Sequence, residues 1–122
     1  MIKSLIQKIK NKHWQKKRIR VNAAMQERLY ADDVSIISAN CNGGIVSHDL
    51  GLQFRSPTVN LFIPANDFIK FCENLEHYLN IDELVECSDI AKTKGANYPV
   101  AYLDDILLFL VHYSSVEEAQ RR

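Results

Sequence analysis

Polar and nucleophilic residues are concentrated in one short segment, Asn40-Cys41-Asn42-Gly43-Gly44, which directly follows a β-branched apolar stretch. In α/β proteins, ligands collect beyond the carboxyl ends of strands, where loops run into helices. Paired glycines allow a tight turn and present backbone N–H groups to an anion, and asparagine side chains add donors. The sequence therefore predicts ligand-binding residues at Asn40, Asn42, Gly43 and Gly44, with Cys41 as a candidate nucleophile. An ordinary tight turn has the same composition, and that alternative stays open.

A cysteine nucleophile needs a base nearby, and two histidines are candidates for that role. His48 follows the glycine pair by four residues, and His112 ends a predicted strand, from which a general base can face a cleft. We add Ser56, in the next loop, as a candidate ligand contact. The spacing does not tie His48, His112, Asp104 or Asp105 into a metal set or a triad, so we favour a structural or solvated role for each of them, with catalysis as the alternative.

Several kinds of site are excluded by missing motifs. The chain has neither a Gly-x-x-x-x-Gly-Lys-Ser/Thr nor a Gly-x-Gly-x-x-Gly pattern, so nothing indicates a nucleotide-phosphate loop. The three cysteines, Cys41, Cys72 and Cys87, are widely spaced and form no Cys-x-x-Cys pair. That spacing argues against both a disulfide framework and a zinc site. We expect no metal and no cofactor.

The elements that must position these residues can be predicted from periodicity. A chain of 122 residues with 47% hydrophobic residues is long enough for one domain with one core. Strand-like runs occupy residues 34–38, 58–63, 84–87, 100–103 and 106–112, the last two joined at Asp104-Asp105. Helices are predicted near residues 45–52, over residues 67–79, and from a Ser114 or Ser115 cap onward. This order predicts an α/β fold with a small mixed sheet and flanking helices over residues 31–122.

Residues 1–30 form a separate segment by charge. They hold nine Lys/Arg and one acid, a net charge of +8, whereas the other 92 residues carry −8. Apolar residues at 2, 5, 6 and 9 have the spacing of one helical face, which predicts a basic amphipathic helix. The plainest expectation is that this helix packs its apolar face on the sheet. The alternative is that residues 1–20 bind an anionic membrane surface. Without a recognisable binding module or interleaved aromatics, we expect no nucleic-acid partner.

The location and assembly of the protein are expectations only. No apolar run approaches the roughly 18–20 residues that a membrane-spanning helix needs, and no secretory signal is recognisable. We expect a cytoplasmic protein, with a place at the periphery of the inner membrane as the alternative. The exposed final strand makes a homodimer a further alternative.

The chain also resembles a known family in a series of ordered blocks. The blocks are residues 36–44, 50–52, 55–63, 67–71, 74–75, 78–79, 98–100, 103–106, 109–113 and 117–119. In this order and spacing they resemble a bacterial family of uncharacterised domains that are commonly described as exopolysaccharide biosynthesis proteins. The similarity runs from about residue 18 to residue 122.

The resemblance implies a role in assembling or decorating a surface glycan. It implies a glycan or nucleotide-sugar ligand at residues 40–44 and, if the protein is an enzyme, a glycan-directed transferase. Members of the family usually carry an aromatic residue at the position of Asn42 and continue past the Glu117-Glu118-Ala119 block. We therefore expect residues 31–122 to be a truncated version of a longer domain. A non-catalytic membrane-surface adaptor and an inactive remnant are the alternatives.

Overall fold

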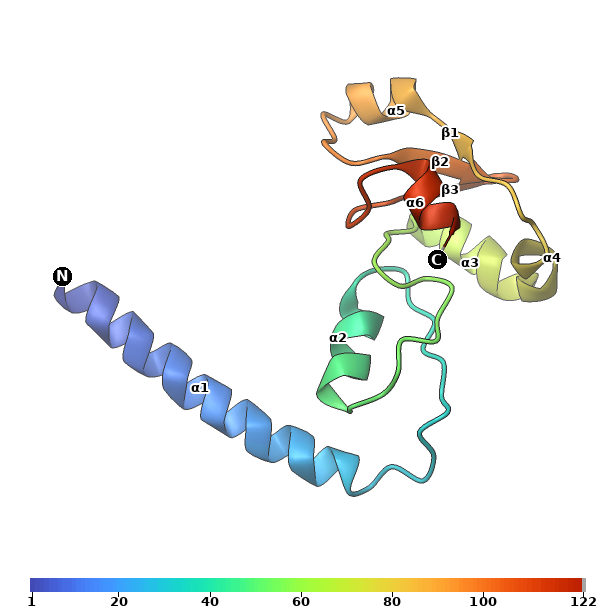
Figure 1. Cartoon of the computed structure of the whole chain (residues 1–122). Coiled ribbons are helices and arrows are strands. Elements are labelled where there is room, and N and C mark those ends of the chain that lie inside the picture. The colour runs from blue at the N-terminus through green and yellow to red at the C-terminus, as the bar shows by residue number, and fades with distance from the viewer. Residues whose placement is uncertain (122) are drawn as a thin grey trace.

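The computed structural model describes residues 1–121 and has helices on both sides of a small sheet (Figure 1). The elements are α1 (Ile2–Gln26), α2 (Asn42–Asp49), α3 (Ala65–Glu73), α4 (Leu75–Leu79), β1 (Val85–Glu86), α5 (Ser88–Thr93), β2 (Val100–Leu103), β3 (Ile106–Phe109) and α6 (Val116–Gln120). The predicted α/β class, with a small sheet and flanking helices, is confirmed.

The sheet has the order β1-β2-β3, and both strand pairs are antiparallel. We expected a mixed sheet, but all three strands are antiparallel, and the strand-like run at 34–38 forms no ladder in the described chain. The predicted hairpin is confirmed, since Leu103 pairs with Ile106 across a two-residue turn. Asp104 has a φ of 54° in this turn, a left-handed conformation that aspartate tolerates better than most residues.

The core lies between the sheet and helices α3, α4 and α6. Its buried residues are Leu61, Ile63, Phe71, Tyr78, Ala101, Ile106, Leu108, Leu110 and Val116. Helix α3 packs against β3, and α5 packs against β2. Asp67, in the first turn of α3, also accepts a hydrogen bond from the Leu107 N–H at 2.9 Å, which fixes the helix along the strand.

Two apolar runs that have strand composition are extended but almost unpaired. Residues 34–38 contain no strand, and residues 58–63 contribute one isolated bridge, Phe62 with Phe109. The first run is held instead by single bonds, such as the one that Ser38 N–H donates to Thr58 Oγ1 at 3.0 Å. β-Branched composition favours an extended chain that buries one side, and it does not by itself supply a partner strand.

The predicted helices form with shifted boundaries. The helix expected near residues 45–52 begins at Asn42 and ends at Asp49. The helix expected over 67–79 is two helices, because Asn74 leaves the helical region with φ −135° and ψ 50°. Its apolar stripe still faces one core, since Phe71 and Tyr78 are both buried. At the end of the chain, Ser115 Oγ accepts the Glu118 N–H at 3.2 Å, which confirms the predicted cap.

Helix α1 stands away from the rest of the protein (Figure 1). The expectation that its apolar face packs on the sheet was wrong, because no residue of α1 is buried. Two side chains attach it to α2: Arg18 pairs with the Asp49 carboxylate at 2.7 Å, and Gln26 Nε2 donates to the Asp49 carbonyl at 2.9 Å. The guanidinium of Arg18 also lowers the pKa of Asp49 from its ordinary value. No helix in residues 1–121 is long and apolar enough to span a bilayer.

The packing of the hairpin on the helices can be tested with a one-methyl deletion. Ile106 is fully buried, so Ile106→Val should lower the free energy of unfolding by about 0.5–1.5 kcal/mol. Ile69 lies on the exposed side of α3, so the matched change Ile69→Val should alter stability by less than about 0.5 kcal/mol. Urea unfolding of both variants measures this difference, and equal losses would contradict the described core.

Candidate functional site

The loop before α2 is closed by its own side chains. Asn40 Oδ1 accepts the Asn42 N–H at 2.9 Å, and Ser38 Oγ accepts the Gly43 N–H at 3.1 Å. These bonds satisfy two of the amides that a helix N-terminus leaves without intrahelical partners. No side chain or loop carbonyl of residues 1–121 accepts the Gly44 N–H. Of the two glycine amides in the predicted anion cradle, that of Gly44 is therefore the one that remains open.

The two glycines of this loop have different structural roles. A Cβ on Gly43 would lie 2.7 Å from Ser38 Oγ, closer than side chains approach, so a larger residue here would displace Ser38 and break the bond that its hydroxyl accepts. A Cβ on Gly44 would meet nothing within 4 Å. Gly43 is thus explained by the closed turn, whereas Gly44 borders open space at the start of α2.

The structure places His112 beside Cys41, although 71 residues separate them in the chain. His112 Nε2 lies 3.2 Å from Cys41 Sγ, within hydrogen-bonding distance for sulfur. Cys41 is half-buried at the N-terminus of α2, and His112 is exposed. An imidazole nitrogen at this distance can accept the thiol proton.

Backbone hydrogen bonds position the two segments of this pair. Phe62 and Phe109 exchange N–H···O bonds of 2.8 Å in each direction. On one side of this bridge, Ile63 N–H donates to the Ala39 carbonyl at 2.8 Å, two residues before Cys41. On the other side, His112 N–H donates to the Asn60 carbonyl at 3.3 Å. The segment 60–63 therefore joins the loop that carries the thiol to the turn that carries the imidazole.

The other predicted site residues lie apart from this pair. His48 is exposed, with Nδ1 3.5 Å from Asp49 Oδ1, and it follows Cys41 by about 10 Å along the axis of α2. Ser56 Oγ lies 3.2 Å from Thr58 Oγ1, which in turn accepts the Ser38 N–H. Ser56 thus helps to connect the loops that contain Thr58 and Ser38. Asn42 is exposed at the first position of α2.

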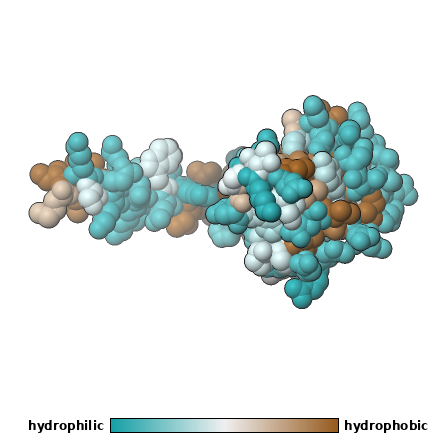
Figure 2. Space-filling view, turned by 90° about the horizontal axis from the view of Figure 1, so that it is seen from above, coloured by the Kyte–Doolittle hydropathy of each residue, from teal (hydrophilic) through white to brown (hydrophobic). Residues whose placement is uncertain are grey.

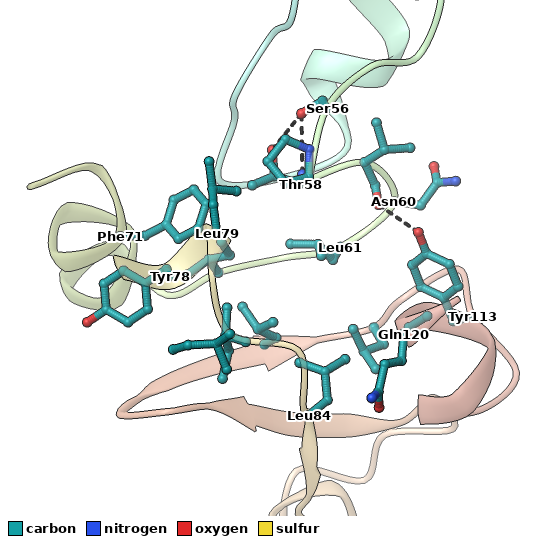
Figure 3. Close-up of a pocket in the computed structure, with 18 of the residues that line it drawn as sticks. Ser56, Thr58, Asn60, Leu61, Phe71, Tyr78, Leu79, Leu84, Tyr113 and Gln120 are labelled. Carbon is teal, nitrogen blue, oxygen red and sulfur yellow. Dashed lines mark hydrogen bonds between the residues drawn. The ribbon is translucent and has the colours of Figure 1, made fainter. Parts of the chain in front are cut away.

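A cavity of about 430 Å³ opens beneath the segment that contains Ser56 (Figure 3). Its floor is apolar, with Leu61, Leu84 and Leu108 among the lining residues. Asn60 and Tyr113 also line it, and the Tyr113 hydroxyl donates to the Val59 carbonyl at 3.1 Å. Since Asn60 holds the His112 backbone and Tyr113 follows it, the cavity shares one edge with the turn that carries the imidazole. The volume is in the range of small-molecule sites.

A second polar cluster surrounds the hairpin turn. The Tyr78 hydroxyl donates to Asp105 at 2.6 Å, and Lys70 Nζ approaches the same carboxylate at 3.1 Å. The Asp105 hydrogen bond raises the pKa of Tyr78 to about 12, and the Tyr78 and Lys70 bonds lower the pKa of Asp105. His77 Nε2 lies 2.7 Å from the Asp104 carboxylate. The cluster joins α3 and α4 to the hairpin.

The remaining cysteines do not extend the site. Cys72 is exposed on α3, and Cys87 precedes α5. Within residues 1–121 no group of three or more His, Cys, Asp or Glu side chains has the geometry to hold a metal ion.

Comparison with known sequences gives two matches. Residues 10–122 match the profile of a family described as "Domain of unknown function (DUF1919)". The chain is also 34% identical over 116 residues to a Haemophilus influenzae (strain Rd) protein described as an uncharacterized protein. That alignment covers 95% of this chain and 53% of the relative, so the chain spans about half of the relative's length.

The different roles of the two glycines generate a stability prediction. Gly43→Ala should lower the free energy of unfolding by about 1–3 kcal/mol, because its Cβ would press on Ser38. Gly44→Ala should leave stability unchanged or raise it by up to about 1 kcal/mol, because alanine favours a helix and meets open space. Urea unfolding compares the two variants. The description of the loop would be wrong if Gly44→Ala cost as much as Gly43→Ala.

The Tyr78–Asp105 bond generates a prediction about alkaline pH. In the folded chain the pKa of Tyr78 is about 12, whereas its ordinary value is 10.0. Between these two pH values the folded chain therefore binds more protons than the unfolded chain. This contribution to stability is complete below about pH 10 and is lost as the pH rises toward 12. Tyr78→Phe should remove this loss, and Tyr102→Phe, on the exposed side of β2, should keep it. Unfolding free energies measured along an alkaline titration provide the test, and identical curves for the wild type and Tyr78→Phe would contradict it.

Proposed function

The chain belongs to the DUF1919 family, and from that premise we propose that it is a transferase of bacterial surface-polysaccharide assembly that carries an acyl group on Cys41. One observation carries the chemistry of this proposal: the 3.2 Å approach of His112 Nε2 to Cys41 Sγ. The polysaccharide part rests on the resemblance of the ordered sequence blocks to exopolysaccharide biosynthesis proteins.

The proposed reaction has two half-reactions. His112 Nε2 takes the proton of the Cys41 thiol, and the sulfur attacks the carbonyl carbon of an acyl donor such as a thioester. The bond from that carbon to the donor's leaving group breaks, and the leaving group takes the proton from His112. A glycan hydroxyl, deprotonated by the same imidazole, then attacks the acyl-enzyme and releases Cys41 as a thiol.

The surroundings of the thiol supply the other requirement of acyl transfer, which is stabilisation of negative charge. The carbonyl oxygen becomes an oxyanion in each half-reaction, and a preorganised N–H donor stabilises it. The amide of Gly44, which lies three residues from Cys41 and has no acceptor in a side chain or loop of residues 1–121, is the donor we assign to this role. The partial positive charge of the α2 N-terminus acts in the same direction.

The cavity beside the turn that carries His112 suggests where different parts of the substrate bind. Its apolar floor suits the apolar part of a donor. Asn60 and Ser56 at its edge can donate hydrogen bonds to hydroxyl groups and accept hydrogen bonds from them. Sugars present both kinds of surface. We therefore assign the cavity to a sugar portion of the glycan or donor.

Covalent labelling tests the nucleophile directly. Treated with p-nitrophenyl acetate, the protein should gain one acetyl group, found by mass spectrometry on the peptide that contains Cys41. Cys41→Ser should form no thioester, and His112→Asn should acylate about 100-fold more slowly because its base is lost. Cys72→Ser provides the matched control, since Cys72 is exposed on a different helix. The proposal fails if Cys72 is acetylated as fast as Cys41.

Surface polysaccharide provides the test in cells. In a deletion strain that has lost a polysaccharide or its acyl decoration, the wild-type gene and Cys72→Ser should restore the product. Cys41→Ser and His112→Asn should not restore it, although both proteins accumulate to the wild-type level. Restoration by Cys41→Ser would exclude thiol catalysis and would favour a non-catalytic role.

A further inference from the structure

The first three turns of α1 carry an apolar stripe that nothing in residues 1–121 covers. The stripe consists of Ile2, Leu5, Ile6 and Ile9, whose side chains are 47–76% exposed. In the space-filling view, apolar residues gather at the end of α1 that lies farthest from the rest of the protein (Figure 2). We propose that residues 1–12 of α1 lie in the surface of an anionic lipid bilayer, with this stripe among the acyl chains and the lysines among the headgroups.

The charges are placed as such a surface requires. Residues 1–12 contain four lysines and no acid. At 100° per residue, the stripe spans about 100° of the helix surface, and Lys3 and Lys10 flank it on one side, Lys8 and Lys12 on the other, about 70–110° from its centre. Lysines at that angle extend along the apolar surface and place their ammonium groups at the phosphates.

The attachment of α1 turns this stripe away from the protein. Arg18 and Gln26 hold the helix to Asp49, and they lie about 170° and 110°, respectively, around the helix from the centre of the stripe. These bonds hold other sides of α1 toward α2, and the stripe remains exposed. Gln7 and Asn11, which bond each other at 3.0 Å, mark the polar side opposite the stripe.

A second copy of the chain is a poorer occupant than a bilayer. Ile2, Leu5 and Ile9 have coiled-coil spacing, but the next two seam positions are Lys12 and Lys16. A seam shorter than two heptads is too short for a stable coiled coil. The two lysines would bring like charges together in a dimer, whereas an anionic bilayer attracts them.

Vesicle co-sedimentation of the chain of residues 1–122 tests the proposal. The protein should bind vesicles of phosphatidylethanolamine with phosphatidylglycerol and not vesicles of phosphatidylcholine, and added salt should weaken binding. Ile6→Glu should reduce binding at least about tenfold, because it places a charge in the stripe. Gln7→Glu adds the same charge on the opposite side and should retain most of the binding.

Each other outcome overturns the proposal in a recognisable way. If Ile6→Glu and Gln7→Glu weakened vesicle binding equally, binding would depend only on the charge of the helix, and the stripe would not insert into the bilayer. No binding at low salt, with self-association that Ile6→Glu abolishes, would assign the stripe to a second copy. Binding to single-stranded nucleic acid in place of vesicles would assign the lysines to that partner. Cys41→Ser should bind vesicles like the wild type, so this test is independent of the acyl-transfer proposal.

Discussion

The candidate site depends on one isolated β-bridge. Phe62 and Phe109 exchange two backbone hydrogen bonds of 2.8 Å, and no other ladder connects the first half of the chain to the sheet within the described residues. The bridge lies between two further contacts, Ile63 with the Ala39 carbonyl and Asn60 with the His112 amide. Loss of this alignment would separate the thiol from the imidazole without changing either residue. The site is therefore a product of tertiary packing, and the closed turn of residues 38–43 adds only the local orientation of Cys41.

The sequence predicted the elements whose signals are local. The β2–β3 hairpin, the Ser115 cap and the apolar stripe through Phe71 and Tyr78 each arise from residues within about a dozen positions of one another. Residues 34–38 were misassigned because β-branched composition does not tell a paired strand from an extended segment. The proximity of Cys41 and His112 could not be predicted, because it depends on the Phe62–Phe109 bridge between distant segments.

The basic helix α1 and the candidate site are connected through α2. Helix α1 is joined to α2 through Asp49, and α2 begins directly after Cys41. Helix α1 held at a bilayer would keep α2 and its N-terminal thiol within a few nanometres of the lipid surface, since 25 residues of helix span about 38 Å. Membrane attachment and acyl transfer remain separable, because the stripe of residues 2–9 and the Cys41–His112 pair share no residue.

The most direct test of the central claim is the alkylation rate of Cys41 by iodoacetamide at neutral pH, with Cys72 of the same molecule as the internal standard. If His112 accepts the proton of the Cys41 thiol, Cys41 should react about tenfold faster than Cys72 in the folded protein. That advantage should disappear in His112→Asn and in urea. Equal rates for the two cysteines in the folded wild type, or a Cys41 rate that His112→Asn leaves unchanged, would contradict the account.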